Sequence, residues 1–225
     1  RIRIENALVP ASTDENNIAA FASIVATFLT ALLLWYEVNT AFVALTWIAI
    51  GLGLFELGKR LSQTVLRVNG YALFAAAFIA LLAVNLYKIY APANAGSIAD
   101  WPVVSIAAAA FYSLTWNLLR VQPRALLGPL EGRCATVPSM AGTTILAILA
   151  WKELDAIYVA PAWTLMALAL TEIGLLARQT RIQDQGHVLA LFAFGRLFVA
   201  NLVAPGEVAM PFSAGEWDLS HRLLT

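Results

Sequence analysis

Two segments of the chain decide the fold: SIVATFLTALLLWYE at residues 23–37 and SMAGTTILAILAWKE at residues 139–153. Extended without a gap, the shift of 116 positions between them aligns residues 23–101 with residues 139–217 and gives 25 identities in 79 positions. Self-similarity at a fixed period marks a repeat architecture. We therefore interpret the chain as a tandem duplication. The matched positions include Trp35/Trp151, Glu37/Glu153, Trp47/Trp163, Glu56/Glu172, Gly58/Gly174, Gly70/Gly186, Phe78/Phe194, Asn85/Asn201 and Trp101/Trp217.

The composition is that of a membrane protein. Hydrophobic residues make up 60% of the 225 residues and charged residues 12%, and the mean hydropathy is +0.75. The charged share is about half that of a soluble globular domain. A soluble helical bundle would need polar faces at the helical period, and residues 72–86 have none. We therefore favour an integral membrane protein over a soluble bundle.

The apolar residues lie in seven runs, most of them about 17 to 20 residues long, which is enough to cross a hydrocarbon core of about 30 Å at 1.5 Å per residue. The fifth run is short and could begin as early as residue 135. The sequence thus predicts an all-α integral membrane bundle with seven transmembrane helices. The runs are residues 18–35, 41–57, 70–89, 102–119, 138–151, 160–177 and 186–203.

The distribution of Lys and Arg predicts the orientation of these spans. If the seven spans are threaded alternately, ten of the fourteen basic residues fall on one side, and Arg196 lies inside a span. The positive-inside rule places that side in the cytoplasm. The opposite side carries Trp35, Trp101, Trp151, Trp217 and Tyr90, which we interpret as anchors at the headgroup level. The ten basic residues are Arg1, Arg3, Lys59, Arg60, Arg67, Arg120, Arg124, Arg133, Arg178 and Arg181.

The repeat unit predicts the domain organisation. Each copy would hold four spans, an even number, so both copies enter the membrane in the same sense and form parallel repeats rather than inverted ones. We expect a cytoplasmic lead-in at residues 1–17, which is too polar for a signal peptide, and a first four-helix repeat at residues 18–138. The second repeat, residues 139–225, would hold three spans and the start of a fourth. We expect the chain to be a fragment of a longer array with further repeats.

A few polar residues fall within the predicted spans, where each is costly enough in lipid to need a partner. Glu56 and Glu172 are equivalent, and Glu56 has Arg60 one helical turn away. The position equivalent to Arg60 is Leu176, but Arg196 lies in the middle of the seventh run. The sixth and seventh runs should pack as an antiparallel pair, and an arginine side chain could bridge the roughly 6 Å of depth between the two charges. We therefore predict that Glu172 neutralises Arg196.

This predicted pair has two interpretations. It could clamp neighbouring helices, since a buried pair can specify packing. It could also line a substrate or ion-coupling site with Asn201. We expect Asn85 and Asn201, near the ends of their spans, to cap or cross-link helices. The candidate intramembrane polar cluster comprises Glu56, Arg60, Asn85, Glu172, Arg196 and Asn201.

Other chemistry finds little support in the sequence. Cys134 is the single cysteine and cannot form an internal disulfide. His187 and His221 have no second ligand at metal spacing, so we expect no metal site, no cofactor and no catalytic residues. The net charge is zero, and topology already explains the basic loops, which removes the case for nucleic acid. The predicted partner is the lipid bilayer.

A recurring pattern resembles that of large bacterial predicted membrane proteins of unknown function, which are built from many tandem helical pairs. The pattern is an apolar span, a segment with Arg and Gly (Arg67 and Gly70; Arg181 and Gly186), a second apolar span and a closing Asn-Leu at residues 85–86 and 201–202. In that family an acidic residue often stands where this chain has asparagine. The resemblance implies a bacterial inner (cytoplasmic) membrane, and the positive-inside rule places loops 58–69, 120–137 and 178–185 in the cytoplasm.

Two classes of function follow. The first is a non-enzymatic structural or envelope-associated membrane component, which the absence of a catalytic motif favours. The second is a transporter or channel-like protein for a small or lipidic substrate, with Glu172 and Arg196 at its intramembrane site. A membrane enzyme is less well supported, because the longest external loop, residues 90–101, offers only Asp100 as an ionisable group.

Overall fold

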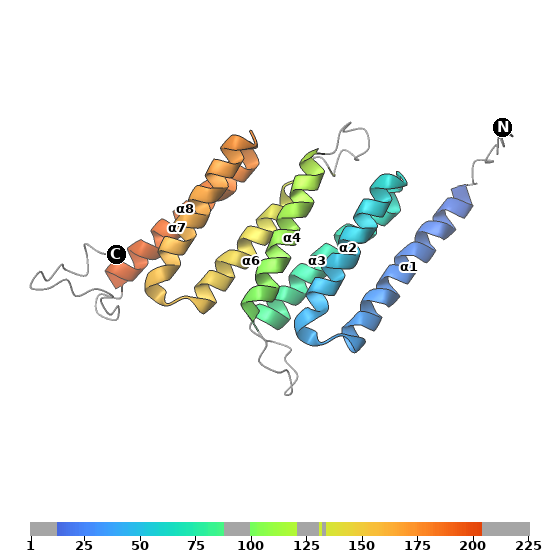
Figure 1. Ribbon diagram of the computed structural model, residues 1–225, viewed down its shortest axis with the longest axis horizontal. Helices are drawn as coiled ribbons and strands as arrows, with labels where there is room; N and C mark the ends of the chain where they lie inside the picture. The colour runs from blue at the N-terminus through green and yellow to red at the C-terminus, as the bar shows by residue number, and fades with distance from the viewer. Residues whose placement is uncertain (1–12, 88–99, 121–130, 132–133, 204–225) are drawn as a thin grey trace, which may run out of the picture. The chain divides into compact units, whose positions relative to one another are not determined.

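A computed structural model describes residues 13–87, 100–120, 131 and 134–203 of the chain, and every element in this part is helical (Figure 1). The elements are α1 (Thr13–Glu37), η1 (Thr40–Phe42), α2 (Val43–Arg60), α3 (Thr64–Ala80), η2 (Leu81–Leu86), α4 (Asp100–Arg120), α6 (Val137–Glu153), α7 (Ala156–Leu176) and α8 (Thr180–Val203). Outside the described residues lie residues 1–12 of the predicted lead-in, Tyr90, Trp217, the expected start of an eighth span and most of the loop 120–137, whereas residues 13–17 of the lead-in belong to α1.

The chain divides into two compact units, Arg1–Ile98 and Ala99–Thr225. The first unit holds α1, η1, α2, α3 and η2, and the second holds α4, α6, α7 and α8. In the first unit α2 packs closely on α3 while α1 contacts both, and in the second α7 packs closely on α8 while α4 packs on α6. The fourth predicted span, α4, therefore packs with the helices that follow it. The predicted repeat boundary at residues 138/139 comes from sequence similarity and does not coincide with the boundary between the two packed units.

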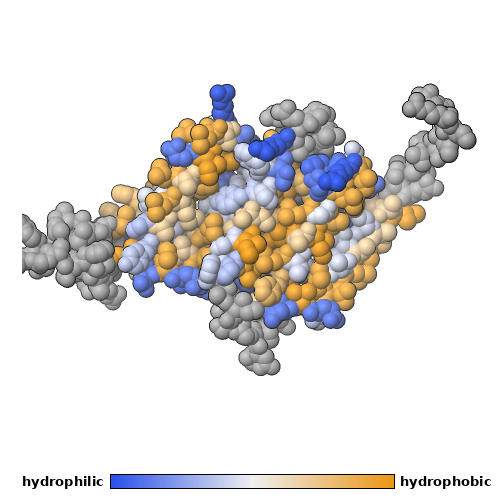
Figure 2. All heavy atoms as spheres, in the orientation of Figure 1, coloured by the Kyte–Doolittle hydropathy of each residue, from blue (hydrophilic) through white to orange (hydrophobic). Residues whose placement is uncertain are grey.

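Five helices of the described residues are long and apolar enough to cross a membrane. They cover residues 17–37, 40–60, 64–86, 101–120 and 156–176. The predicted spans 138–151 and 186–203 also lie on single helices, α6 and α8, which are not among these five. In Figure 2 the apolar colour covers the bodies of the helices, and the most hydrophilic residues gather near their ends. This distribution is the one expected of helices with lipid around their middles.

The turns that join α2 to α3 and α7 to α8 are shorter than the sequence predicted. Ser62 and Arg178 have φ of 54° and 53°, in the left-handed region. The next residue in each turn, Gln63 or Gln179, donates its amide to the carbonyl of Gly58 or Gly174 at 2.8 Å. This is the Schellman arrangement that ends a helix abruptly. The predictions of loops over 58–69 and 178–185 were therefore wrong in extent, because α3 and α8 begin at Thr64 and Thr180.

Glycines allow the paired helices to approach closely. A Cβ on Gly70 would lie 2.8 Å from the Gly51 carbonyl oxygen, and a Cβ on Gly186 would lie 2.7 Å from that of Ala167. At the turns, a Cβ on Gly58 would meet Arg67 and one on Gly174 would meet Gln183, each at less than 3.0 Å from a backbone nitrogen. The close contact is with backbone in every case, so a larger residue could be accommodated only by moving a helix.

Two tryptophans join neighbouring helices: Trp47 joins α2 to α1, and Trp163 joins α7 to α6. Trp47 Nε1 donates to the Ala31 carbonyl and Trp163 Nε1 to the Ala147 carbonyl, both at 3.0 Å. The ring of Trp47 also lies 5.7 Å from that of Trp35, and the ring of Trp163 lies 5.6 Å from that of Trp151. Each indole thus has a partner for its N–H and an aromatic neighbour for its face.

We predict that Gly186→Ala destabilises the protein by about 1–3 kcal/mol, because overpacking would push α8 away from α7. Gly195→Ala on the same helix is the matched control. A Cβ there meets nothing within 4 Å, so this change should be neutral or stabilising by up to about 1 kcal/mol. A reversible unfolding titration in detergent micelles measures both effects. Equal stability of the two variants would contradict the close approach.

Candidate intramembrane polar site

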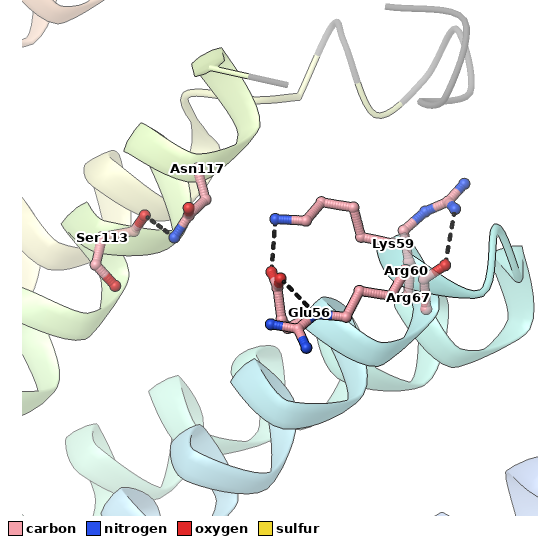
Figure 3. A network of polar contacts seen from close by, with 7 residues as sticks. Glu56, Lys59, Arg60, Arg67, Ser113 and Asn117 are labelled. Atoms are coloured by element: carbon pink, nitrogen blue, oxygen red, sulfur yellow. Dashed lines mark hydrogen bonds and ion pairs between the residues drawn. The ribbon is translucent and has the colours of Figure 1, made fainter. Parts of the chain in front are cut away.

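Glu56 forms ion pairs within its own helix. Arg60 Nε lies 3.1 Å from Glu56 Oε1, and Lys59 Nζ lies 2.5 Å from Oε2 (Figure 3). The pair expected between Glu56 and Arg60 is therefore present, and Lys59 adds a second cation. The Arg60 side chain is 74% exposed. Such an exposed i,i+4 pair contributes only a few tenths of a kcal/mol, so it supports the end of α2 and does not form a helix-to-helix clamp.

Arg67, predicted to lie in a cytoplasmic loop, is buried within α3 at 4% exposure. Its Nη1 lies 3.5 Å from the Gly58 carbonyl oxygen, and its Nη2 lies 3.4 Å from Thr64 Oγ1. The carbonyl it approaches is the one that accepts the amide of the Schellman turn. A cation at this position interacts favourably with the negative end of the dipole of α2.

Asn85 cross-links two elements, as expected of an asparagine near the end of a span. Its Nδ2 donates to the carbonyl of Ala41 at 3.2 Å, which joins η2 to η1. The side chain is 2% exposed, and its Oδ1 has no hydrogen-bond partner. Asn201 lies on α8, but its side chain falls outside the described residues.

The predicted ion pair between Glu172 and Arg196 is wrong. Glu172 is exposed, and neither Glu172 nor Arg196 belongs to the ion pairs that Glu56 forms with Lys59 and Arg60. Glu172 lies four residues before the end of α7, and Arg196 lies sixteen residues after the start of α8. In an antiparallel pair these positions differ in depth by twelve residues, or about 18 Å. The estimate from sequence was too small because α8 begins at Thr180, six residues before the predicted start of its span.

Arg196 instead packs on a tryptophan. Its Cζ lies 4.9 Å from the centre of the Trp151 ring, which joins α8 to α6. A guanidinium over an indole face is stabilised by about 0.5–2 kcal/mol, more when water is excluded. Its Nε is buried and has no hydrogen-bond acceptor. The ring therefore supplies the only favourable electrostatic contact that the structure gives this cation in the described residues.

The second unit contains a buried polar network that the sequence analysis did not anticipate. Gln185 of α8 is 6% exposed, and its Nε2 donates to Ser139 Oγ at 2.9 Å. Its Oε1 accepts from Thr143 Oγ1 at 3.4 Å. Tyr112 of α4 extends the network, because its hydroxyl lies 2.7 Å from Thr143 Oγ1. We call these four residues the amide network. It joins α4, α6 and α8 without any formal charge.

The first unit contains the same arrangement of groups. Asn69 of α3 donates from Nδ2 to Ser23 Oγ at 2.9 Å and to Thr27 Oγ1 at 3.2 Å, both on α1. Thr27 and Thr143 each back-bond to a serine carbonyl four residues earlier, Ser23 and Ser139, at 2.9 Å. The carboxamides and their serine and threonine partners are related by the same shift of 116 residues that aligns the sequence, although Thr27 accepts from Asn69 whereas Thr143 donates to Gln185.

A signal for this network was available in the sequence. Ser23/Ser139 and Thr27/Thr143 are among the 25 identities. In each copy the serine and the threonine are four residues, or about one helical turn, apart inside an apolar run. Asn69 and Gln185 are both carboxamides at equivalent positions. These neutral residues carry the signal because hydroxyl and amide side chains are the usual hydrogen-bonding groups between helices in lipid.

An apolar cavity of about 480 Å³ lies beside the amide network in the second unit. It is lined by α4, α6 and α7, with Ile182 from α8. The described residues that line it include no acidic or basic residue. Thr115 is a lining residue that is 3% exposed, and its Oγ1 has no hydrogen-bond partner. In the described part of the chain no three His, Cys, Asp or Glu side chains gather where they could hold a metal ion.

Comparison with known proteins adds no relative: no family model, no curated protein and no solved structure matches the chain. The resemblance to tandem-repeat membrane proteins therefore rests on its sequence motifs alone. Of the residues in the predicted polar cluster, Glu56 contacts Arg60, and Arg196 contacts Trp151, which lies outside that cluster.

We predict that Gln185→Leu destabilises the protein by about 1–2 kcal/mol, the upper part of the range for interhelical hydrogen bonds in membranes, because Ser139 and Thr143 lose one shared partner. Gln185→Asn should recover part of the loss, since the first unit uses asparagine with the same partners. Asn117→Leu is the control, because the Asn117 amide bonds the Ser113 carbonyl of its own helix (Figure 3). Unfolding titrations in micelles measure these effects. If the free energy of unfolding of Gln185→Leu equals that of the parent, the network does not stabilise the protein.

Proposed function

We propose that the chain is a non-enzymatic structural component of a membrane, built from parallel tandem repeats. The supporting observation is that neutral polar groups at depth form hydrogen bonds between equivalent helices in each unit. Asn69 with Ser23 and Thr27 corresponds to Gln185 with Ser139 and Thr143. Side chains used in this way hold helices together and are not free to bind a reactant.

Other contacts that recur after 116 residues support the same proposal. They include the indole–carbonyl bonds of Trp47 and Trp163, the left-handed residues Ser62 and Arg178, and the crowded glycines at 70 and 186. By this shift α1, α2 and α3 correspond to α6, α7 and α8. Because their equivalents α1 and α3 are long and apolar enough to cross a membrane, as α2, α4 and α7 are, we propose that α6 and α8 cross it too, giving seven spans.

The proposed orientation has the turns at residues 61–63 and 177–179 in the cytoplasm, where the positive-inside rule puts the basic side. In a Cys134→Ser background, single cysteines at the equivalent positions Thr64 and Thr180 should react with a membrane-impermeant maleimide only after the cells are opened. Cysteines at Asn39 and Asp155 should react in intact cells. These two residues are also equivalent and exposed. If equivalent positions label from opposite sides, the repeats are not parallel.

The alternative of a transporter or channel retains one supporting observation. Arg196 lies about 24 Å along α8 from its start, and its Nε has no acceptor. A lone cation at depth is a candidate for an anion pathway. The separation of Glu172 from Arg196 weakens the version in which both residues line one site.

We predict that Arg196→Leu alters stability and not permeability. Its effect on unfolding should be coupled to that of Trp151→Leu by about 0.5–2 kcal/mol in a double-mutant cycle. The cycle with Glu172→Gln should show no coupling, because the two side chains are far apart. Vesicles containing the parent or the variant should release chloride at the rate of protein-free vesicles. Chloride release by the parent that Arg196→Leu abolishes, at unchanged stability, would replace the structural proposal with the transport alternative.

A further inference from the structure

We infer that the cavity of the second unit binds an acyl chain of an anionic glycerophospholipid, with Thr115 donating a hydrogen bond to an ester carbonyl and Arg120 pairing with the phosphate. The inference does not rest on the proposed structural role. It requires only that α4 and α7, both long and apolar enough to cross a membrane, lie in a bilayer.

The lining and position of the cavity suit a hydrocarbon chain. Its volume of about 480 Å³ is within the range of about 300–1,000 Å³ typical of ligand pockets. The lining residues near its outer end are Ile173 and Ile182, three and two residues from the ends of their helices, and those at its inner end are Leu146 and Met166. At 1.5 Å per residue the cavity reaches about 15 Å inward, half of a hydrocarbon core. It therefore spans the depth of one lipid leaflet.

Thr115 has a buried hydroxyl that no neighbouring group of the described residues bonds, and it could form a hydrogen bond to a ligand. Most helical threonines of this unit back-bond to a carbonyl four residues earlier, as Thr143, Thr144, Thr164 and Thr171 do. Thr115 is as buried as the core, yet its hydroxyl has no partner. A buried hydroxyl without a partner costs about 1–3 kcal/mol. An ester carbonyl entering the outer half of the cavity would supply the acceptor.

Arg120 marks the mouth of the cavity. Its Cζ lies 4.3 Å from the centre of the Trp116 ring, and Trp116 is a lining residue. Tyr112, Thr115, Trp116 and Leu119 line the cavity from one face of α4, since their spacings of three, four and seven residues recur on a single side of a helix. Arg120 lies one and a half turns outward from Thr115, about 7.5 Å along the axis. This order of groups matches a lipid whose phosphate lies outside its ester carbonyls.

The test uses the chain reconstituted in phosphatidylcholine vesicles that contain a phosphatidylglycerol with a photoreactive acyl chain. Labelled residues are located by mass spectrometry. Label should concentrate on Leu146, Met166 and Leu170 and be sparse on Leu165 and Leu168, which are exposed on α7 but do not line the cavity. Unlabelled phosphatidylglycerol should displace the cavity label better than phosphatidylcholine does.

Two variants separate binding from folding. Thr115→Val should lower cavity labelling about three- to tenfold, as the loss of about one hydrogen bond predicts, yet be at least as stable as the parent in lipid-free micelles. Arg120→Gln should remove the preference for the anionic lipid. Thr164→Val on α7 is the matched control and should leave labelling unchanged. Labelling of Leu165 and Leu168 as strong as that of the cavity residues, or labelling that neither variant changes, would overturn the inference.

Discussion

The structure depends on the requirement that polar groups in an apolar medium find their partners within the protein. Helices meet this requirement for the backbone, which is why every element in the described residues is helical. The side chains meet it through a few contacts between helices. Gln185 and Asn69 each bridge to a serine and a threonine one turn apart, and Trp47 and Trp163 each bond a carbonyl of the preceding helix.

Glycine and the left-handed turn then determine how closely the helices approach. The three-residue turns after α2 and α7 reverse the chain abruptly. Glycines such as Gly70 and Gly186 leave room for the facing backbone. Apolar side chains gain little from leaving lipid for another apolar surface, so close packing of this kind is a main source of helix association in membranes. The pairs α2/α3 and α7/α8 are accordingly the most closely packed in their units.

Where partners are missing, the structure indicates chemistry beyond packing. Thr115 Oγ1 and Arg196 Nε are both buried without an acceptor, and their surroundings differ. Arg196 has the face of Trp151, which compensates part of the cost of a buried cation. Thr115 has an apolar cavity beside it. The first arrangement is adequate as a structural contact, whereas the second leaves space and an unused donor for a ligand.

The features that depend on local geometry could be predicted from the amino-acid sequence. Apolar runs of span length predicted the helices, and the spacing of Glu56 and Arg60 predicted their pair, because a helix brings residues i and i+4 together wherever it lies. Only the tertiary structure decided which helix faces meet and at what depth. A shift of six residues in the start of α8 moved Arg196 about 9 Å along its axis, away from Glu172 and to Trp151. The amide network likewise depends on the rotation of α4, α6 and α8 about their axes, which packing against neighbouring helices sets and the spacing of residues within one helix does not.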